Sequence, residues 1–253
     1  MRTWLDITEG FPIRFDVERM RTDLTTLVEG GWLDHYDKGL SSGFGAILLN
    51  SKNGDISGPE SQLPSWDFSD YRRTPYVERL PYFREIMDRL KCPQGRMRIL
   101  RLAPGAVIAK HRDVGAEVGC LAFRQVRLHV PIVTNDHVTF FVGGEKIKMQ
   151  VGHLYYVNFA KSHYVRNDGD EARIHLVMDL KVNEWLNQYF PPPTGWEQIE
   201  FAAARATWPT FWRFRWWRVK AQRQFWKHYE GSRIQALVRP VVHRIRGKTR
   251  AAT

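Results

Sequence analysis

Apolar and polar residues alternate with a period of two through the middle of the chain, between residues 96 and 182. Such alternation is typical of strands that bury one face. The predicted strands are residues 96–103, 126–133, 153–159 and 172–182, with a hairpin over 137–152 that turns at Gly143 and Gly144. Short strands at close spacing predict a mainly β fold with a jelly-roll core, that is, a double-stranded β-helix of the cupin type.

The same alternation gathers polar side chains on one face of two predicted strands. In VRLHVPIV, the apolar residues at every second position leave Arg127 and His129 on the opposite face. In ARIHLVMDLKV, Arg173 and His175 are left in the same way. If the apolar faces pack outward against helices, Arg127, His129 and Arg173 point into the interior of the barrel, and His175 shares the face of Arg173.

Two helices precede the strands. Residues 15–30 and 80–91 have apolar positions at helical spacing, and Pro81 lies near the first turn of the second helix. Residues 40–75 are rich in Gly, Ser, Asp and Pro and predict loops around one strand, GAILLN. We expect the helices to cover the outside of the β core.

The positive charge is concentrated at one end of the chain. The net charge is +11, yet residues 201–253 hold 13 Lys and Arg, one acid and five of the ten tryptophans. The rest of the chain has a charge of −1. We therefore expect one folded domain over residues 1–195, with its jelly-roll core at about 96–182. A basic, Trp-rich helical extension is expected over residues 196–253.

Only Cys92 and Cys120 are present, which excludes a disulfide scaffold and a cysteine-based zinc site. The first residues include no apolar run of signal-peptide length, and no stretch approaches the about 20 apolar residues that cross a bilayer. A cytoplasmic protein is expected, with peripheral attachment at the inner face of the membrane as a variant. The oligomeric state is left open.

The extension permits three interpretations. Aromatic and cationic side chains segregate partly around a helix over residues 208–229, with Trp212, Trp216, Arg213 and Arg218 as candidate contacts. The helix either lies on an anionic membrane, binds an acidic partner or nucleic acid, or packs on the domain with its cations in water.

The candidate chemistry begins with KHRDVG. His111 and Asp113 are two residues apart, so on an extended chain both side chains lie on one face. A surface pair is the alternative for this common spacing. His163, after a predicted strand, supplies a second imidazole. Two histidines and one carboxylate on a β scaffold form the facial triad of non-haem Fe(II) oxygenases.

Such an enzyme needs cations for its cosubstrate. The usual cosubstrate, 2-oxoglutarate, has two carboxylates, and burying them requires positive partners. The planar fork of arginine binds a carboxylate through two hydrogen bonds. Arg127, His129 and Arg173 are the candidates, with ordinary surface or structural roles as alternatives.

The segments FDVERMRTDLTTL, LPYFREIMDRL, RILRLAPGAVIAKHRD, VRLHVPIVTND and GHLYYVNFAKSHYVRNDGDEARIHLVMD occur in this order over about residues 14–182. In this the chain resembles the aspartyl/asparaginyl β-hydroxylase-like Fe(II)/2-oxoglutarate dioxygenases, with the cis-proline hydroxylases most similar in outline. The resemblance implies iron ligands His111, Asp113 and His163. It implies that Arg127 and His129 bind one carboxylate of 2-oxoglutarate and that Arg173 binds the other.

The resemblance also implies the reaction. A C–H bond of an amino acid, an amino-acid derivative or a peptide side chain would be hydroxylated with Fe(II), 2-oxoglutarate and O₂, giving succinate and CO₂, with ascorbate as a supporting reductant. The alternatives are a lipid acyl chain as substrate, reached through the extension, and a non-catalytic binding protein. Further candidates for lining the pocket are His175, for which a structural role is the alternative, Asn158, for which turn formation is the alternative, and Arg112.

Overall fold

A computed structural model of the protein describes residues 1–27, 32–34, 41, 43–57, 59–62, 67–113 and 119–207. The chain divides into two compact units, Met1–Ala202 and Ala203–Thr253. Of the second unit, residues 203–207 are described, and they are helical. The extension residues singled out in the sequence lie outside the described residues: Trp212, Arg213, Trp216 and Arg218. The expected boundary after residue 195 stays a prediction.

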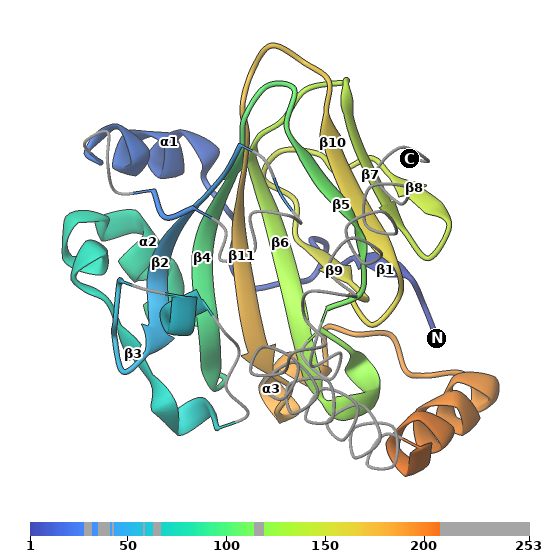
Figure 1. Ribbon diagram of the computed structural model, residues 1–253. Coiled ribbons are helices and arrows are strands. Elements are labelled where there is room, and N and C mark those ends of the chain that lie inside the picture. Colours follow the sequence, from blue (N-terminus) through green and yellow to red (C-terminus); the bar gives the residue numbers. More distant parts are fainter. Residues whose placement is uncertain are drawn as a thin grey trace, which may run out of the picture. The chain divides into compact units, whose positions relative to one another are not determined.

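The first unit is built on two antiparallel sheets (Figure 1). The larger sheet has seven strands in the order β1-β9-β6-β11-β4-β2-β3. Its strands are β1 (Trp4–Asp6), β2 (Phe44–Lys52), β3 (Tyr71–Arg73), β4 (Gln94–Leu102), β6 (Gln125–Val133), β9 (Tyr155–Val157) and β11 (Arg173–Lys181). The sheet order, which places chain-distant strands side by side, is that of a jelly roll, and the predicted fold class is confirmed.

The smaller sheet has four strands in the order β5-β10-β7-β8. They are β5 (Val107–His111), β7 (Val138–Val142), β8 (Glu145–Ile147) and β10 (His163–Asn167). The predicted hairpin joins β7 to β8, and Gly143 and Gly144 have φ values of 59° and 91°. Two consecutive residues of positive φ make the turn that matches strand twist, and glycine adopts them without steric cost.

Helices cover one face of the larger sheet, and the smaller sheet covers the other (Figure 1). The helices are α1 (Val17–Thr25), α2 (Pro81–Arg89) and α3 (Glu184–Asn187), with short 3-10 turns at Pro59–Gln62, Phe68–Asp70, Pro75–Arg79 and Leu121–Phe123. In the described part of the chain, no helix is long and apolar enough to cross a membrane.

The alternation in the sequence determines which face each side chain takes. The apolar residues of β4, β6 and β11 form one core with those of α1 and α2. A second apolar cluster, which includes Phe140, Phe159 and Val165, fills the space between the two sheets. The apolar faces of the central strands therefore pack outward against the helices, as expected, and their polar faces line the interior.

The buried carboxylate of Asp23 connects helices α1 and α2. Asp16 begins α1 by accepting a hydrogen bond from the backbone N–H of Arg19. Near the end of α1, the carboxylate of Asp23 accepts from the backbone N–H groups of Tyr82 and Phe83 at 2.8 and 3.1 Å. These are donors that the first turn of α2 leaves without partners, so Asp23 fixes the two helices against each other.

Several local predictions need correction. His163 was expected in a loop after a strand, but it begins the strand β10. The first helix is shorter than residues 15–30, because Thr26 ends it. Strands β1 and β3, of three residues each, were not predicted because three residues are too few to show a period.

Candidate metal centre and cosubstrate pocket

The two candidate imidazoles face each other across neighbouring strands. His111 is the last residue of β5 and His163 the first of β10, and the two are register partners in this antiparallel pair. Their ring centroids are 4.2 Å apart. Residues directly opposite on paired strands project to the same side of the sheet, so the register itself brings the rings together.

Backbone carbonyls orient both rings. The Nδ1 atom of His111 lies 2.7 Å from the carbonyl oxygen of Ala109, and that of His163 lies 3.0 Å from the carbonyl oxygen of Lys161. Since a carbonyl oxygen only accepts, each Nδ1 carries the hydrogen. Each Nε2 is left with its lone pair, which is the state in which histidine binds a metal.

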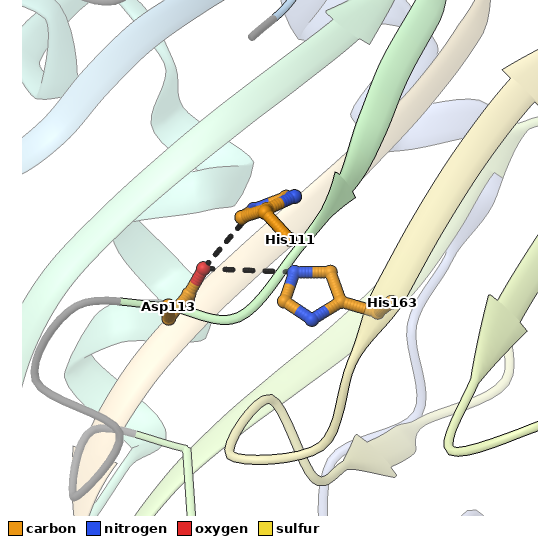
Figure 2. A group of neighbouring side chains, drawn as sticks. All are labelled: His111, Asp113 and His163. Carbon is orange, nitrogen blue, oxygen red and sulfur yellow. Dashed lines mark ion pairs between the residues drawn. The ribbon is translucent and has the colours of Figure 1, made fainter. Parts of the chain in front are cut away.

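Asp113 completes the group, as Figure 2 shows. Its Oδ1 atom is 3.3 Å from Nε2 of His111 and 3.5 Å from Nε2 of His163. One ligand atom from each of the three residues lies within 4.8 Å of the others. Two imidazole nitrogens and a carboxylate oxygen around one point are the donor set that suits Fe(II), so the residues present fit the metal that the sequence predicts.

The carboxylate of Asp113 is kept ionised. Burial acts to raise its pKa, but the positive charge of Arg127 and the contacts with both histidines hold the pKa well below the ordinary value. Nη1 of Arg127 donates to Oδ2 of Asp113, which leaves Oδ1 toward the histidines. A charged, fixed carboxylate is what a divalent cation requires.

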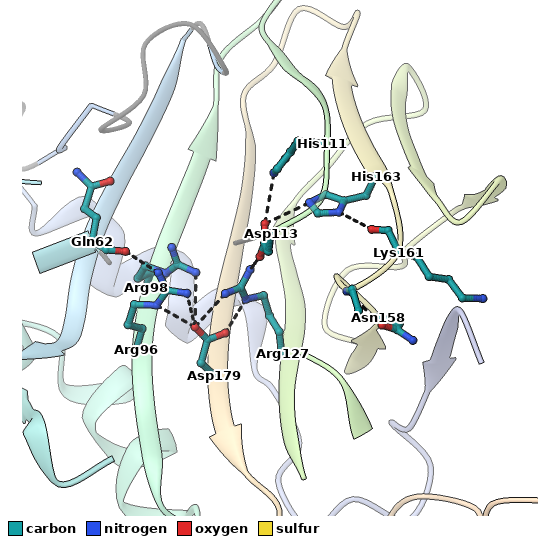
Figure 3. A network of polar contacts seen from close by, with 11 residues as sticks. Gln62, Arg96, Arg98, His111, Asp113, Arg127, Asn158, Lys161, His163 and Asp179 are labelled. Carbon is teal, nitrogen blue, oxygen red and sulfur yellow. Dashed lines mark hydrogen bonds and ion pairs between the residues drawn. The ribbon is translucent and has the colours of Figure 1, made fainter. Parts of the chain in front are cut away.

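Arg127 belongs to a buried ionic network, drawn in Figure 3. Besides Asp113, it contacts Asp179 through two hydrogen bonds, Nε to Oδ1 at 2.5 Å and Nη2 to Oδ2 at 3.1 Å. Arg96 contacts the same carboxylate, with Nε at 3.0 Å and Nη2 at 2.9 Å from Oδ2. The guanidinium of Arg127 is therefore occupied by acids of the protein, and its predicted role toward 2-oxoglutarate stays a prediction.

Arg173, by contrast, is buried and forms no ion pair with any acid in the described part of the chain. It is 3% exposed, its Nη2 lies 2.9 Å from Nδ1 of His175, and its Nε has no hydrogen-bond partner. Burial lowers its pKa to about 9. A cavity of about 340 Å³ has Arg173, His175 and Phe140 in its wall. The cavity wall does not include the histidine–aspartate group, so the two features are neighbours rather than one pocket.

His129 also has unused polar atoms. It is 4% exposed, neither ring nitrogen has a hydrogen-bond partner, and its ring stacks on Phe159 at 5.2 Å. Phe159 in turn contacts the ring of His163 edge-on at 4.7 Å. Burial and the charge of Arg173 place the pKa of His129 well below its ordinary value, so the ring is neutral. Buried polar atoms without partners are uncommon and mark this interior as a place for a ligand.

Of the remaining candidates, Asn158 and Arg112 lie away from the pocket, whereas His175 lines it. The side chain of Asn158 donates to the carbonyl of Arg2 and accepts from the backbone N–H of Ala160, as a turn former does. Arg112 is exposed. His175 lies on the interior face with Arg173, and burial and that neighbouring charge hold its pKa well below the ordinary value.

Three interior residues were missed in the sequence. Arg96 and Arg98 occupy alternate positions of β4, and Asp179 follows Arg173 and His175 on the polar face of β11. The alternation that identified Arg173 and His175 extends to all three. Charged residues that share one face of an otherwise apolar strand were the signal that could have found them.

The family model for aspartyl/asparaginyl beta-hydroxylase matches residues 16–182. No curated protein matches the chain significantly. Similar solved structures include a 2OG-Fe(II) oxygenase family oxidoreductase from Burkholderia pseudomallei, with 15% identity and a TM-score of 0.41 over 65% of this chain and 77% of that one. A prolyl-4-hydroxylase from Pseudomonas putida has 12% identity and a TM-score of 0.42 over 72% and 94%.

The family match stands by itself, because it covers well over half of the chain and contains every residue of the candidate centre and pocket. It agrees with the resemblance seen in the sequence and confirms the predicted class of enzyme, a 2-oxoglutarate-dependent hydroxylase. The chain belongs to the aspartyl/asparaginyl beta-hydroxylase family.

Proposed function

We propose that the protein hydroxylates an unactivated C–H bond of an amino acid, an amino-acid derivative or a peptide side chain. His111, Asp113 and His163 hold Fe(II), and Arg173 holds the distal carboxylate of 2-oxoglutarate. Iron with this cosubstrate and O₂ supplies the oxidation, and succinate and CO₂ are the co-products.

One observation carries the proposal. A three-ligand group with free Nε2 lone pairs and an ionised carboxylate shares an interior with a buried guanidinium that has no acidic partner among the described residues. A structural ion pair would give Arg173 an acid, and a structural histidine pair would not need a carboxylate at 3.3 and 3.5 Å. Leaving a buried guanidinium unpaired is costly unless an anion binds there.

The surrounding residues support an anionic cosubstrate in this space. His129 and His175 are neutral and offer three ring nitrogens without partners, so they add hydrogen-bonding capacity without competing for the anion. Phe140 lies against the guanidinium of Arg173, 5.4 Å from its central carbon, and excludes water from that side. Each charge-assisted hydrogen bond to a carboxylate contributes about 1.5–3 kcal/mol.

The protein's own task is to hold groups in place. The carbonyls of Ala109 and Lys161 fix the two rings, and Arg127 fixes the carboxylate of Asp113. Groups that are oriented before the substrate arrives need no reorganisation during the reaction.

The direct test is succinate release from 2-oxoglutarate. The purified full chain is incubated with Fe(II), ascorbate and O₂, alone and with amino acids, short peptides or lipid extracts. We expect substrate-stimulated succinate formation that stops when a chelator removes the metal. Absence of succinate in every arm, from protein that has been shown to bind Fe(II), would refute the proposed activity and leave the non-catalytic alternative.

The alternative of a lipid acyl substrate depends on the extension, most of which lies outside the described residues. The described helix that leads into it exposes Trp196 and Ile199, 71% and 60% accessible. The lipid arm of the screen tests this alternative. Retention on anionic liposomes or RNA, compared between the full chain and a chain lacking residues 201–253, tests the predicted membrane, acidic-partner and nucleic-acid roles.

A further inference from the structure

Among the described residues, Arg98 is, after Arg173, a second buried arginine without a close acidic partner. It lies on the interior face, on the strand next to β11. Arg98 is on β4, where it is the register partner of Val177, two residues from Asp179. Its Nε is buried without a hydrogen-bond partner, while 11% of its side-chain surface stays accessible. Arg98 is therefore largely dehydrated, with a small part of its side chain still accessible.

The neighbouring acid cannot satisfy Arg98. Among the described residues, Asp179 is the one acid within 4.0 Å, and the closest approach is 3.9 Å, from Nη2 to Oδ2. That oxygen already receives Arg96 at 2.9 Å and Arg127 at 3.1 Å. Oδ1 receives Arg127 at 2.5 Å. The short contacts of Asp179 are all made to the other two guanidiniums.

The charges of the interior leave an excess that 2-oxoglutarate alone does not remove. Four arginines face two carboxylates among the described interior residues: Arg96, Arg98, Arg127 and Arg173 against Asp113 and Asp179. The excess is two positive charges. Fe(II) adds two and 2-oxoglutarate removes two, so two remain after both have bound. Arg173 accounts for the distal carboxylate of 2-oxoglutarate, and among the described acids Arg98 has only its long contact with Asp179.

The electrostatics agree with this geometry. Burial first, and then the charges of Arg96 and Arg127, lower the pKa of Arg98 to about 9, while Asp179 and Asp113 act in the opposite direction. The side chain stays a cation at neutral pH. Contacts also connect Arg98 to the metal ligands, because Asp179, its nearest acid, binds Arg127, and Arg127 binds Asp113.

We propose that Arg98 binds a carboxylate of the prime substrate, so that the enzyme acts on a small carboxylic acid such as a free amino acid. This rests on the proposed function and narrows it. The planar guanidinium binds a carboxylate through two hydrogen bonds. A mid-chain methylene of a lipid, or a side chain in the middle of a peptide, brings no such group to the interior beside the iron.

The matched control for Arg98 is Arg101. It is on the same strand, three residues away, so it projects from the other face, and it is exposed. Arg101 lies over the ring of Trp32, 5.9 Å from its centroid. The variants R98Q, R98K and R101Q therefore compare an interior and an exterior cation of one strand. A thermal melt of each variant shows whether it is folded.

The first measurement needs no turnover. Full-length protein labelled with ¹⁵N at arginine Nε and loaded with redox-inert Zn(II) is followed by NMR, and signals are assigned by their loss in R98K, R101Q and R173K. We expect 2-oxoglutarate to shift the Arg173 signal. Sodium acetate, added afterwards at constant ionic strength, should then shift the Arg98 signal saturably and leave Arg101 unchanged. An Arg98 signal that ignores acetate, or that responds only to inorganic phosphate, overturns the inference.

The second measurement uses turnover. Succinate formation is compared between common L-amino acids and their carboxamides. We expect wild type and R101Q to favour the acid of a stimulating pair by about 10- to 100-fold in kcat/KM and R98Q to lose that preference. A neutral substrate that stimulates fully, an acid preference that survives in R98Q, or no acid that stimulates overturns the inference.

Failure of the proposed function and failure of the inference about Arg98 give different results. If Arg173 does not respond to 2-oxoglutarate and no succinate forms, the proposed function fails, and the acetate titration of Arg98 still decides whether that side chain binds a carboxylate. If succinate forms without a substrate in wild type and R98Q alike, the proposed function stands, and the acid–amide comparison decides the inference.

Discussion

Arg127 and Asp179 are joined by two hydrogen bonds, Nε to Oδ1 at 2.5 Å and Nη2 to Oδ2 at 3.1 Å, inside the β core. The same guanidinium donates to Asp113. Asp179 therefore positions Arg127, which in turn positions the candidate metal ligand Asp113. Because these residues come from β6 and β11, the ligand geometry depends on the pairing of the two central strands.

We expect Asp179→Asn to lower the free energy of unfolding by about 3–5 kcal/mol, because it leaves Arg96 and Arg127 buried without their carboxylate. Urea unfolding followed by tryptophan fluorescence measures this. The control is Asp168→Asn, which removes an exposed partner of Arg166 and should change stability little. Equal stability of the two variants would contradict the prediction.

The pH dependence of the same pair follows from the direction of the shift. Burial acts to raise the pKa of Asp179, but Arg127 and Arg96 lower it below the ordinary value. A depressed pKa in the folded state means that the contribution of Asp179 is present above the unfolded pKa, about 3.9, and is lost as the pH falls below it. The stability difference between wild type and Asp179→Asn should therefore narrow below about pH 4. A difference that stays constant through this range would show that the carboxylate is not responsible.

We expect His111→Ala and His163→Ala each to abolish metal-dependent turnover and to weaken Co(II) binding to the purified protein by at least tenfold. Each change removes one of three ligands from the centre. Binding is measured by titration followed in the visible absorption of Co(II). His153→Ala is the matched control, because His153 pairs with Asp6 outside the centre. Unchanged Co(II) affinity in the first two variants would refute the ligand assignment.

Arg173→Ala should raise the 2-oxoglutarate concentration needed for half-maximal turnover by about 10- to 100-fold, since it removes a charge-assisted contact with the distal carboxylate. Metal affinity should not change, because Arg173 is not among the ligands. The dependence of succinate release on 2-oxoglutarate measures the effect. Arg166→Ala, an exposed cation on β10, is the control. A normal requirement in Arg173→Ala would refute the assigned role.

Both thiols should resist alkylation in the folded protein. Burial raises the pKa of Cys92 to about 12, and burial also raises the pKa of Cys120. Since the thiolate is the reactive form, iodoacetamide at pH 8 should label neither in native protein and both in denaturant. Mass spectrometry counts the adducts. Rapid native labelling of either cysteine would show that its surroundings open in solution.

The sequence determined the long central strands and the side chains on them that face the interior. Alternation in β6 and β11 is a local property of residues two apart, so it placed Arg127, His129, Arg173 and His175 on one face without knowledge of any partner. The spacing of His111 and Asp113 gave two candidate ligands in the same way. The same reasoning, applied further along the strands, would have included Arg98 and Asp179.

Only the tertiary structure decided how these side chains combine. The register of β5 with β10 places His111 opposite His163, and the register of β6 with β11 places Arg127 opposite Asp179. These pairings join segments that are distant in sequence, and a shift of one residue would reverse every face. Which arginines are paired and which remain for ligands therefore depends on long-range strand pairing, and the local pattern of the chain does not contain it.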